Sequence, residues 1–278
     1  MLTATLEFMN KVVFITGASS GIGKATAIKL ADQGHTVYGS ARELDDLKDY
    51  KNINPIVLDM TDYKSLETAV NSIVKREGKI DVLFNNAGYG LYGTVEETSI
   101  EDAKKQFDVN LFGLARLTQL VLPHMRTNGS GTIINTSSMG GRMYTPLGAW
   151  YHATKHALEG WSDCLRLELK QFNIKVVIIE PGIIKTAWGE IAADNIERTS
   201  ENGPYANFAK KTADNMRRTY DPNNSASSPE VVANVVAKAI NSNRPKTRYI
   251  VGKYARTLMF MRKYFGDRIF DYIILKAK

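Results

Sequence analysis

Residues 12–23 read Val-Val-Phe-Ile-Thr-Gly-Ala-Ser-Ser-Gly-Ile-Gly, and this stretch decides the fold. The run from Val12 to Thr16 is largely apolar and is typical of a short buried strand. A glycine-rich turn follows, and from Ile22 the apolar residues have helical spacing that stops at Gly34. A strand, a glycine turn and a helix in this order form the setting in which backbone N–H groups hold a pyrophosphate. The stretch therefore predicts a dinucleotide site, and a tight turn without a ligand is the alternative.

The alternation of strand and helix continues along the chain. Further strands are expected over 36–40, 56–58, 80–84, 132–136, 174–180 and 248–251, and further helices over 63–76, 100–125, 149–172 and 229–241. Apolar strands joined by long helices predict a parallel sheet that is buried on both sides. The expected fold is an α/β, Rossmann-type doubly wound sheet of about seven strands, in a single domain.

Three segments depart from this pattern. Residues 1–8 precede the first strand and are expected to be a leader or disordered. Within the expected domain, residues 9–252, the polar segment 187–228 predicts an irregular lid over the substrate. Residues 253–278 predict a helical extension that is rich in aromatic residues and has a net charge of +5. We expect this extension to pack on the body or on a partner subunit; contact with an anionic membrane surface is the alternative.

Composition excludes several classes of protein. The chain has 36 Lys and Arg against 29 Asp and Glu, a net charge of +7. Since +5 of this lies in residues 253–278, only +2 remains for the body, and such a small excess does not argue for nucleic-acid binding. The sequence contains no run of 18 apolar residues, so no membrane-spanning helix is expected. The single cysteine, Cys164, excludes an intramolecular disulfide and is expected in the core, so a cytoplasmic location is favoured. The four histidines are scattered and predict no metal site.

The second expected strand ends at Ser40-Ala41-Arg42, where dinucleotide-binding proteins that use NAD have an acidic residue. Ala41 offers no acceptor for a ribose hydroxyl. The guanidinium of Arg42 suits a 2′-phosphate through its charge and its paired donors. The sequence therefore favours NADP(H) over NAD(H), unless Arg42 is only a solvated surface charge.

Tyr151 and Lys155 are four residues apart on an expected helix and so share one face. A free tyrosine has a pKa of about 10, and a nearby ammonium lowers the pKa toward the range of a working acid–base group. Ser138 follows the 132–136 strand, at the carboxyl edge of the sheet, where its hydroxyl can hold a substrate oxygen. A chance Tyr-x-x-x-Lys and an ordinary turn serine are the alternatives.

Six motifs occur together in order: Thr16-Gly17-x3-Gly21-x-Gly23, Asn85-Asn86-Ala87-Gly88, Asn110, Ser138, Tyr151-x3-Lys155 and Pro181-Gly182-x3-Thr186. Over about residues 10–190 the chain resembles the short-chain dehydrogenase/reductase family, an NADP-preferring member in particular. Residues 229–254, with Arg244-Pro245-x2-Arg248-Tyr249, are most similar to its branch of retinol and hydroxysteroid dehydrogenases and acyl-dihydroxyacetone-phosphate reductases.

The resemblance implies roles for particular residues. Tyr151 would be the general acid/base, Lys155 its activator, Ser138 the partner of the reacting oxygen and Asn110 the residue that positions Lys155 and a proton-relay water. The residues implied to bind the cofactor are Gly17, Ser19, Ser20, Gly21, Ile22, Gly23, Arg42, Asp59, Met60, Asn86, Ala87, Gly88, Tyr151, Lys155, Pro181, Gly182, Ile184 and Thr186. For Asp59 and Asn86 a turn or strand-end hydrogen bond is the alternative.

The expected substrate pocket is mainly apolar. Its implied lining residues are Met139, Met143, Tyr144, Leu147, Trp150 and Trp188, some of which would otherwise be core or dimer contacts. The favoured function is hydride transfer between NADP(H) and a lipophilic small-molecule substrate, an alcohol, ketone or aldehyde, in a homodimer or homotetramer. A non-catalytic NADP-binding sensor and a membrane-associated reductase of a lipid intermediate are the alternative functions.

Overall fold

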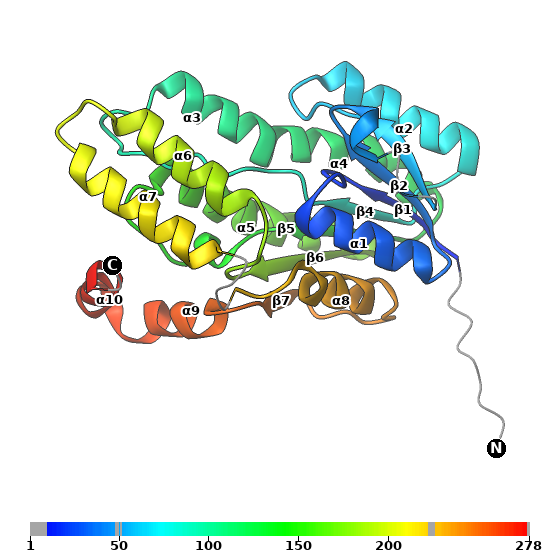
Figure 1. The fold of residues 1–278 in the computed structure, drawn as a ribbon. Helices are drawn as coiled ribbons and strands as arrows, with labels where there is room; N and C mark the ends of the chain where they lie inside the picture. Colours follow the sequence, from blue (N-terminus) through cyan, green and yellow to red (C-terminus); the bar gives the residue numbers. More distant parts are fainter. Residues whose placement is uncertain (1–9, 48–49, 51, 222–225, 277–278) are drawn as a thin grey trace.

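The structure is a computed structural model that describes residues 10–47, 50, 52–221 and 226–276, so the predicted leader, residues 1–8, lies outside the described residues. Seven parallel strands form one sheet in the order β3-β2-β1-β4-β5-β6-β7, as the alternating pattern predicts (Figure 1). The strands are β1 (Val12–Ile15), β2 (Thr36–Ala41), β3 (Ile53–Val57), β4 (Val82–Asn85), β5 (Gly131–Thr136), β6 (Ile174–Pro181) and β7 (Arg248–Val251).

The middle of the sheet determines where a ligand binds. Val13 of β1 pairs with Val37 of β2 on one side and with Val82 of β4 on the other. The strand order therefore reverses between β1 and β4, because the chain first winds outward to β3 and then returns to the other side of β1. In open parallel sheets the crevice at the carboxyl ends of two such strands is the usual ligand site.

Helices cover both faces of the sheet (Figure 1). They are α1 (Gly21–Asp32), α2 (Tyr63–Glu77), α3 (Ile100–Phe107), α4 (Leu114–Thr127), α5 (Ala149–Leu169), α6 (Trp188–Ser200), α7 (Ala206–Tyr220), α8 (Pro229–Ile240), α9 (Ala255–Tyr264) and α10 (Gly266–Lys276). Val12 and Phe14 pack in one core with α2, α4 and α5, whereas Val13 and Ile15 pack in the other with α1 and α8. Side chains alternate along a strand, so a strand that is covered on both faces must be apolar throughout.

The helix expected over residues 100–125 is divided. A π-helical segment, Asp108–Gly113, separates α3 from α4 and contains Asn110. Such widened turns occur frequently at functional sites because they re-aim one side chain. Gly113 allows the segment to approach the loop after β3, since a Cβ there would lie 2.2 Å from the carbonyl oxygen of Met60.

The prediction that residues 187–228 are irregular is wrong for most of the segment, which forms α6 and α7. The two helices pack on each other largely through small residues, with Ala192 and Ala193 facing Ala209 and Ala213 in one cluster. Alanine is the strongest helix former but gives a weak apolar pattern, and this explains the error. Arg217 of α7 also forms ion pairs with carboxylates of α6, namely Glu190, Asp194 and Glu197.

The C-terminal extension consists of α9 and α10, which run along one side of the molecule (Figure 1). Ala255, Met259 and Phe270 are its buried side chains. In the part of the chain that the structure describes, no helix is long and apolar enough to cross a membrane. Cys164 was expected in the core but is exposed, because it lies on the outer side of α5, away from Leu158 and Leu165.

Candidate active site

The glycine turn joins β1 to α1 at the carboxyl edge of the sheet, beside the end of β4. The side-chain Nδ2 of Asn86 donates hydrogen bonds to the carbonyl oxygens of Thr16 (3.1 Å) and Gly17 (3.2 Å). The Thr16 hydroxyl accepts in return from the backbone N–H groups of Asn86 (3.0 Å) and Ala87 (2.9 Å). Asn86 thus makes strand-end hydrogen bonds, the alternative to a role in cofactor binding, and these bonds fix the shape of the turn.

The turn has the close packing that a dinucleotide site needs. Gly17 has φ +66°, and a Cβ there would lie 3.0 Å from the Cα of Ala87. A Cβ on Gly23 would lie 2.0 Å from the carbonyl oxygen of Gly17. Ser20 precedes α1 without forming a side-chain cap, so the first N–H groups of the helix have no capping side chain there. Bare backbone at a helix N-terminus fits the pyrophosphate of a dinucleotide. The same turn carries Ser19, Gly21 and Ile22.

Charged side chains stand at the ends of the next two strands. Ala41 ends β2 and is buried, whereas Arg42 directly after it is exposed. Asp59 follows β3, and its Oδ1 accepts hydrogen bonds from the backbone N–H and the hydroxyl of Thr61, both 2.8 Å. These bonds lower the pKa of Asp59, and the charge of Arg42 acts in the same direction. The Oδ1 of Asp59 is therefore occupied by hydrogen bonds within the turn. Met60, the next residue, is buried.

Asn110 and Lys155 lie together beside the end of β4. The Asn110 Nδ2 donates to the hydroxyl of Thr154 on α5 (3.2 Å), and the Lys155 Nζ donates to the carbonyl oxygen of Thr136 at the end of β5 (2.8 Å). A Cβ on Gly88 would lie 2.9 Å from the Asn110 Oδ1 and 3.9 Å from the Lys155 Nζ. Both polar groups therefore border Gly88, in the Asn-Asn-Ala-Gly motif after β4.

Tyr151 lies one helical turn before Lys155 on α5 and is 7% exposed. Burial raises the pKa of Tyr151 to about 12, and a hydrogen bond with Ser138 acts in the opposite direction. Burial also lowers the pKa of Lys155 to about 8. The expectation that the lysine brings the tyrosine pKa below its usual value is wrong for this closed arrangement, in which desolvation of the phenolate dominates.

Aromatic rings cover Tyr151. The ring centroids of Trp188 and Tyr92 lie 5.2 Å and 5.6 Å from that of Tyr151. Tyr220 packs on the other side of Trp188 at 5.4 Å. Trp188 is the first residue of α6 and Tyr220 the last of α7, so the helical pair shields the tyrosine. A cavity of about 500 Å³ is lined by Thr186 and Tyr220 and by charged side chains of α6 and α7, among them Glu190 and Arg217.

The segment after β6 lies against the glycine turn. A Cβ on Gly21 would lie 2.9 Å from the Cγ2 of Thr186, so the predicted cofactor residues at the two motifs are in contact. Pro181 ends β6, and Gly182 donates a backbone hydrogen bond to β7. Ile184 is 3% exposed and packs in the core with α1 and α8.

The predicted substrate residues divide into two groups. Leu147 and Trp188 pack on the cluster that contains Tyr151. Tyr144 is directed toward the C-terminal extension, where its hydroxyl donates to Asp271 (2.9 Å) and its ring packs on Phe270 (5.2 Å). Of the remaining predicted residues, Met139 and Met143 lie in the same loop and Trp150 at the start of α5. Met143 is buried.

His152 organises this loop, a role that its position on an expected helix does not predict. Its Nε2 accepts from the backbone N–H of Thr145 (3.0 Å), so its Nδ1 donates to the carbonyl oxygen of Gly140 (2.9 Å). Burial lowers the pKa of His152 to about 4, which keeps the ring neutral as this pairing requires. A Cβ on Gly148 would lie 2.7 Å from the ring, so the loop closes tightly around it.

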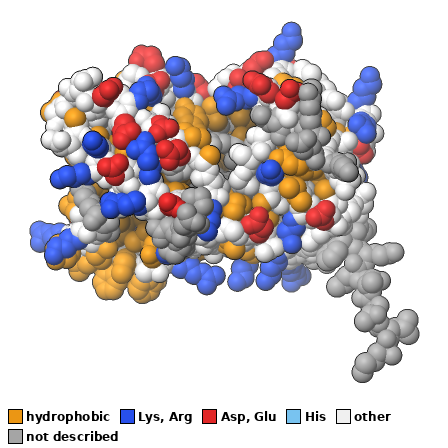
Figure 2. All heavy atoms as spheres, viewed as in Figure 1, with side chains coloured by type: hydrophobic (Ala, Val, Ile, Leu, Met, Phe, Trp, Pro, Cys, Tyr) orange, Lys and Arg blue, Asp and Glu red, His pale blue; other side chains and the backbone are white. Residues whose placement is uncertain are grey.

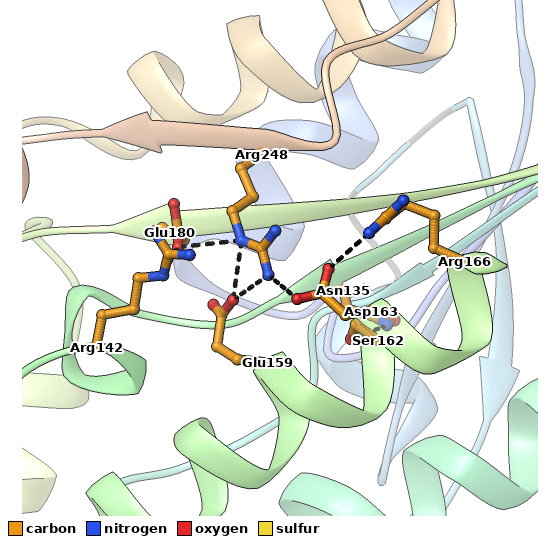
Figure 3. A network of polar contacts seen from close by, with 8 residues as sticks. All are labelled: Asn135, Arg142, Glu159, Ser162, Asp163, Arg166, Glu180 and Arg248. Carbon is orange, nitrogen blue, oxygen red and sulfur yellow. Dashed lines mark hydrogen bonds and ion pairs between the residues drawn. The ribbon is translucent and has the colours of Figure 1, made fainter.

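A partly buried network of ion pairs links α5 to β6 and β7 (Figure 3). Arg248 of β7 contacts Glu159 (3.0 Å) and Asp163 (2.7 Å) on α5 and lies 3.6 Å from Glu180 of β6. Arg142, from the loop after Ser138, reaches Glu180 at 3.1 Å. The network therefore connects four elements: α5, the loop after β5 that contains Arg142, β6 and β7.

Burial raises the pKa of Glu180 to about 7, and the neighbouring charge of Glu159 adds to the rise. Arg142 and Arg248 act in the opposite direction but do not cancel the desolvation. Isolated acidic or basic residues in the sequence give no sign of this arrangement, because its members come from four elements and span positions 142 to 248. Within the described residues, no group of three or more metal-ligating side chains is present.

A doubly wound sheet with a bare glycine turn beside a Ser–Tyr–Lys–Asn cluster defines a nucleotide-dependent oxidoreductase of the short-chain class. The family model described as short chain dehydrogenase matches residues 11–196. The chain belongs to the short-chain dehydrogenase/reductase family, and its sheet and single domain are those of the family.

Several known proteins are similar over nearly the whole chain. The 3-ketodihydrosphingosine reductase of Bacteroides thetaiotaomicron is 33% identical over 95% of this chain and 96% of its own length. The NADPH-dependent 3-dehydrocapnine reductase of Ornithobacterium rhinotracheale is 35% identical over 94% and 95%. A crystal structure of a short-chain dehydrogenase from Streptomyces avermitilis is 33% identical, covers 91% of each chain and superposes with a TM-score of 0.79. Other solved structures of this fold hold NAD or NADP.

Proposed function

We propose that the protein reduces a lipophilic ketone or aldehyde to an alcohol with NADPH, and catalyses the reverse oxidation with NADP. The observation that carries this proposal is the cluster of Ser138, Tyr151, Lys155 and Asn110 beside the glycine turn. When bound, the nicotinamide supplies or accepts the hydride. All other steps fall to side chains of this chain.

In reduction the carbonyl oxygen gains a proton as its carbon gains the hydride. Tyr151 Oη is the proton donor, and its raised pKa keeps the phenol protonated at neutral pH. The Ser138 hydroxyl donates a hydrogen bond to the same oxygen and so stabilises the negative charge that develops on it. Lys155 stabilises the tyrosinate that remains. Asn110 donates a hydrogen bond to Thr154, which precedes Lys155 on α5, and so helps to position Lys155.

The choice of NADPH rests on the residue that follows β2. Arg42 is exposed at the carboxyl edge, and the buried Ala41 before it carries no acceptor. A guanidinium there attracts a 2′-phosphate, and Ser19 in the turn adds a hydroxyl donor. The relative from Ornithobacterium rhinotracheale is named as NADPH-dependent, which agrees with this choice.

A lipophilic substrate is supported by the aromatic rings that surround Tyr151. Tyr92, Leu147, Trp188 and Tyr220 are the neighbours that a substrate must contact or displace. The names of two relatives specify a dehydro or keto substrate, in one case a ketodihydrosphingosine.

The test is a screen of NADPH consumption over long-chain 3-ketones, ketosteroids, retinal, acyl-dihydroxyacetone phosphate and short aldehydes, repeated with NADH. We expect the highest kcat/KM with a long-chain or polycyclic carbonyl and with NADPH. A preference for small hydrophilic aldehydes would contradict the substrate class, and a preference for NADH would contradict the cofactor.

A further inference from the structure

The C-terminal extension exposes several large aromatic and aliphatic side chains to solvent. Seven of its large apolar side chains are between 49% and 61% exposed: Tyr254, Phe260, Tyr264, Phe265, Ile269, Tyr272 and Leu275. Three of them stack on one another, with Phe260 at 4.7 Å from Tyr264 and 6.2 Å from Phe265. Figure 2 shows a continuous hydrophobic patch at the lower left, where α9 and α10 lie in Figure 1. Patches of this kind usually mark an interaction site.

Cations surround these aromatic residues. The extension carries six described basic residues, Lys253, Arg256, Arg262, Lys263, Arg268 and Lys276, against Asp267 and Asp271. The two carboxylates are already used, because Asp267 pairs with Arg262 (2.6 Å) and Asp271 accepts from the Tyr144 hydroxyl. The Lys263 and Lys276 ammonium groups lie 5.1 Å and 4.7 Å from the rings of Tyr264 and Tyr272. Blue side chains also follow the lower edge of the molecule in Figure 2.

The extension is fixed to the body by few contacts, and one of them reaches the substrate loop. Phe270 is the buried side chain of α10, and its ring packs against Tyr144. Tyr144 lies between Ser138 and Tyr151 in the sequence, in the loop that His152 closes. The extension that carries the exposed patch therefore contacts, through Tyr144, the loop that joins Ser138 to the helix of Tyr151.

We propose that α9 and α10 dock on the surface of an anionic lipid bilayer, and that this docking places the Tyr144 loop where a lipid-dissolved substrate leaves the membrane. The inference rests on the proposed lipophilic substrate. Interfacial helices combine aromatic residues that enter the headgroup region with lysines and arginines that face anionic lipids. The extension has both, on a pair of helices whose outer sides are unoccupied by the described body.

A second copy of the chain is the competing occupant, and charge argues against it. In a two-fold symmetric interface each patch meets itself, so the unpaired cations of one copy would face those of the other. Like charges brought together in this way oppose association. An anionic bilayer supplies the opposite charge over the same area.

The test is flotation of the full chain with vesicles of phosphatidylcholine, with and without phosphatidylglycerol. We expect binding to the anionic vesicles that weakens with salt. Lys263→Glu with Arg268→Glu should reduce the affinity roughly thirtyfold or more, because each cation near an anionic surface contributes about fivefold. Lys75→Glu with Lys104→Glu is the matched control, since both residues are exposed on α2 and α3, on the opposite side of the molecule (Figure 1). Phe265→Ser with Ile269→Ser should also abolish binding without a change of charge.

Equal binding by the charge variant and its control would overturn the proposal. So would a lack of vesicle binding together with an oligomer, seen by light scattering, that dissociates in the Phe265→Ser and Ile269→Ser variant, since the patch would then be an interface between copies. Turnover of a short water-soluble ketone is measured on the same proteins. It should stay at the wild-type level in all variants, so a failure of docking is distinguishable from a failure of the catalytic proposal.

Discussion

Replacement of Glu180 by glutamine should stabilise the protein above pH 7 and change its stability little near pH 5. The Glu180 side chain is 0% exposed, and its pKa is raised to about 7 from an ordinary value of 4.5. Glutamine keeps the shape of the side chain and removes the buried charge. Arg248 keeps its contacts with Glu159 and Asp163, and Arg142 is 44% exposed, so water can solvate its guanidinium.

The sign follows from which state holds the proton. Between pH 4.5 and about 7 the folded state keeps a proton on Glu180 that the unfolded chain has released. Wild-type stability therefore decreases as the pH rises through this window, and the loss is complete above it. At about 1.4 kcal/mol per pKa unit, the full effect is roughly 3 kcal/mol. For a chain of this size that corresponds to a melting temperature higher by on the order of 5–10 °C in Glu180→Gln at pH 8.

Thermal denaturation followed by circular dichroism at pH 5, 6, 7 and 8 measures the effect. Glu168→Gln makes the same chemical change on the exposed side of α5, outside the ionic network, and is the matched control. If Glu180→Gln were less stable than wild type at pH 8, the ion pairs with Arg142 and Arg248 would outweigh the burial cost, and the reasoning would be refuted. A difference independent of pH would refute it equally.

Three further predictions concern the site. Lys155→Met should lower turnover by roughly a hundredfold or more and also weaken NADPH binding in a fluorescence titration; an unaltered dissociation constant would exclude its role at the ribose. Ala41→Asp with Arg42→Ala should reverse a preference for NADPH over NADH that we expect to be on the order of tenfold, and a wild type that prefers NADH would contradict our assignment of this turn. Arg217→Met removes the ion pairs between α7 and α6, so amide exchange in both helices should speed up about tenfold while the sheet is unaffected; unchanged exchange would show that small-residue packing alone holds the pair.

The sheet and the glycine turn were predictable because both depend on local patterns. Val12 to Ile15 is apolar on both faces, and Gly17 and Gly23 stand where backbone must approach backbone or ligand. Tyr151 and Lys155 were likewise predictable as neighbours, since helix geometry alone places them on one face. The order of motifs along the chain then indicated the family and its doubly wound sheet.

The remaining features depend on contacts between distant residues, which one sequence does not reveal. Helices α6 and α7 bury alanines such as Ala192 and Ala213, whose pattern is too weakly apolar to distinguish a helix from a polar loop. The neutral His152 and the buried Glu180 acquire their properties from partners on other elements. The raised pKa of Tyr151 follows from burial, to which the ring of Trp188 contributes. The sequence predicts Trp188 as a substrate-lining residue of an irregular lid, and not as the first residue of a helix.

The central claim is that Tyr151 Oη transfers the proton in an NADPH-dependent carbonyl reduction. The most direct test compares the rate of NADPH oxidation by wild type and Tyr151→Phe, with the best substrate of the screen and saturating cofactor. The account predicts a loss of roughly 10²- to 10⁴-fold in kcat with an unchanged dissociation constant for NADPH, because phenylalanine keeps the ring packing and removes only the proton donor. A turnover near that of the wild type in Tyr151→Phe would contradict it.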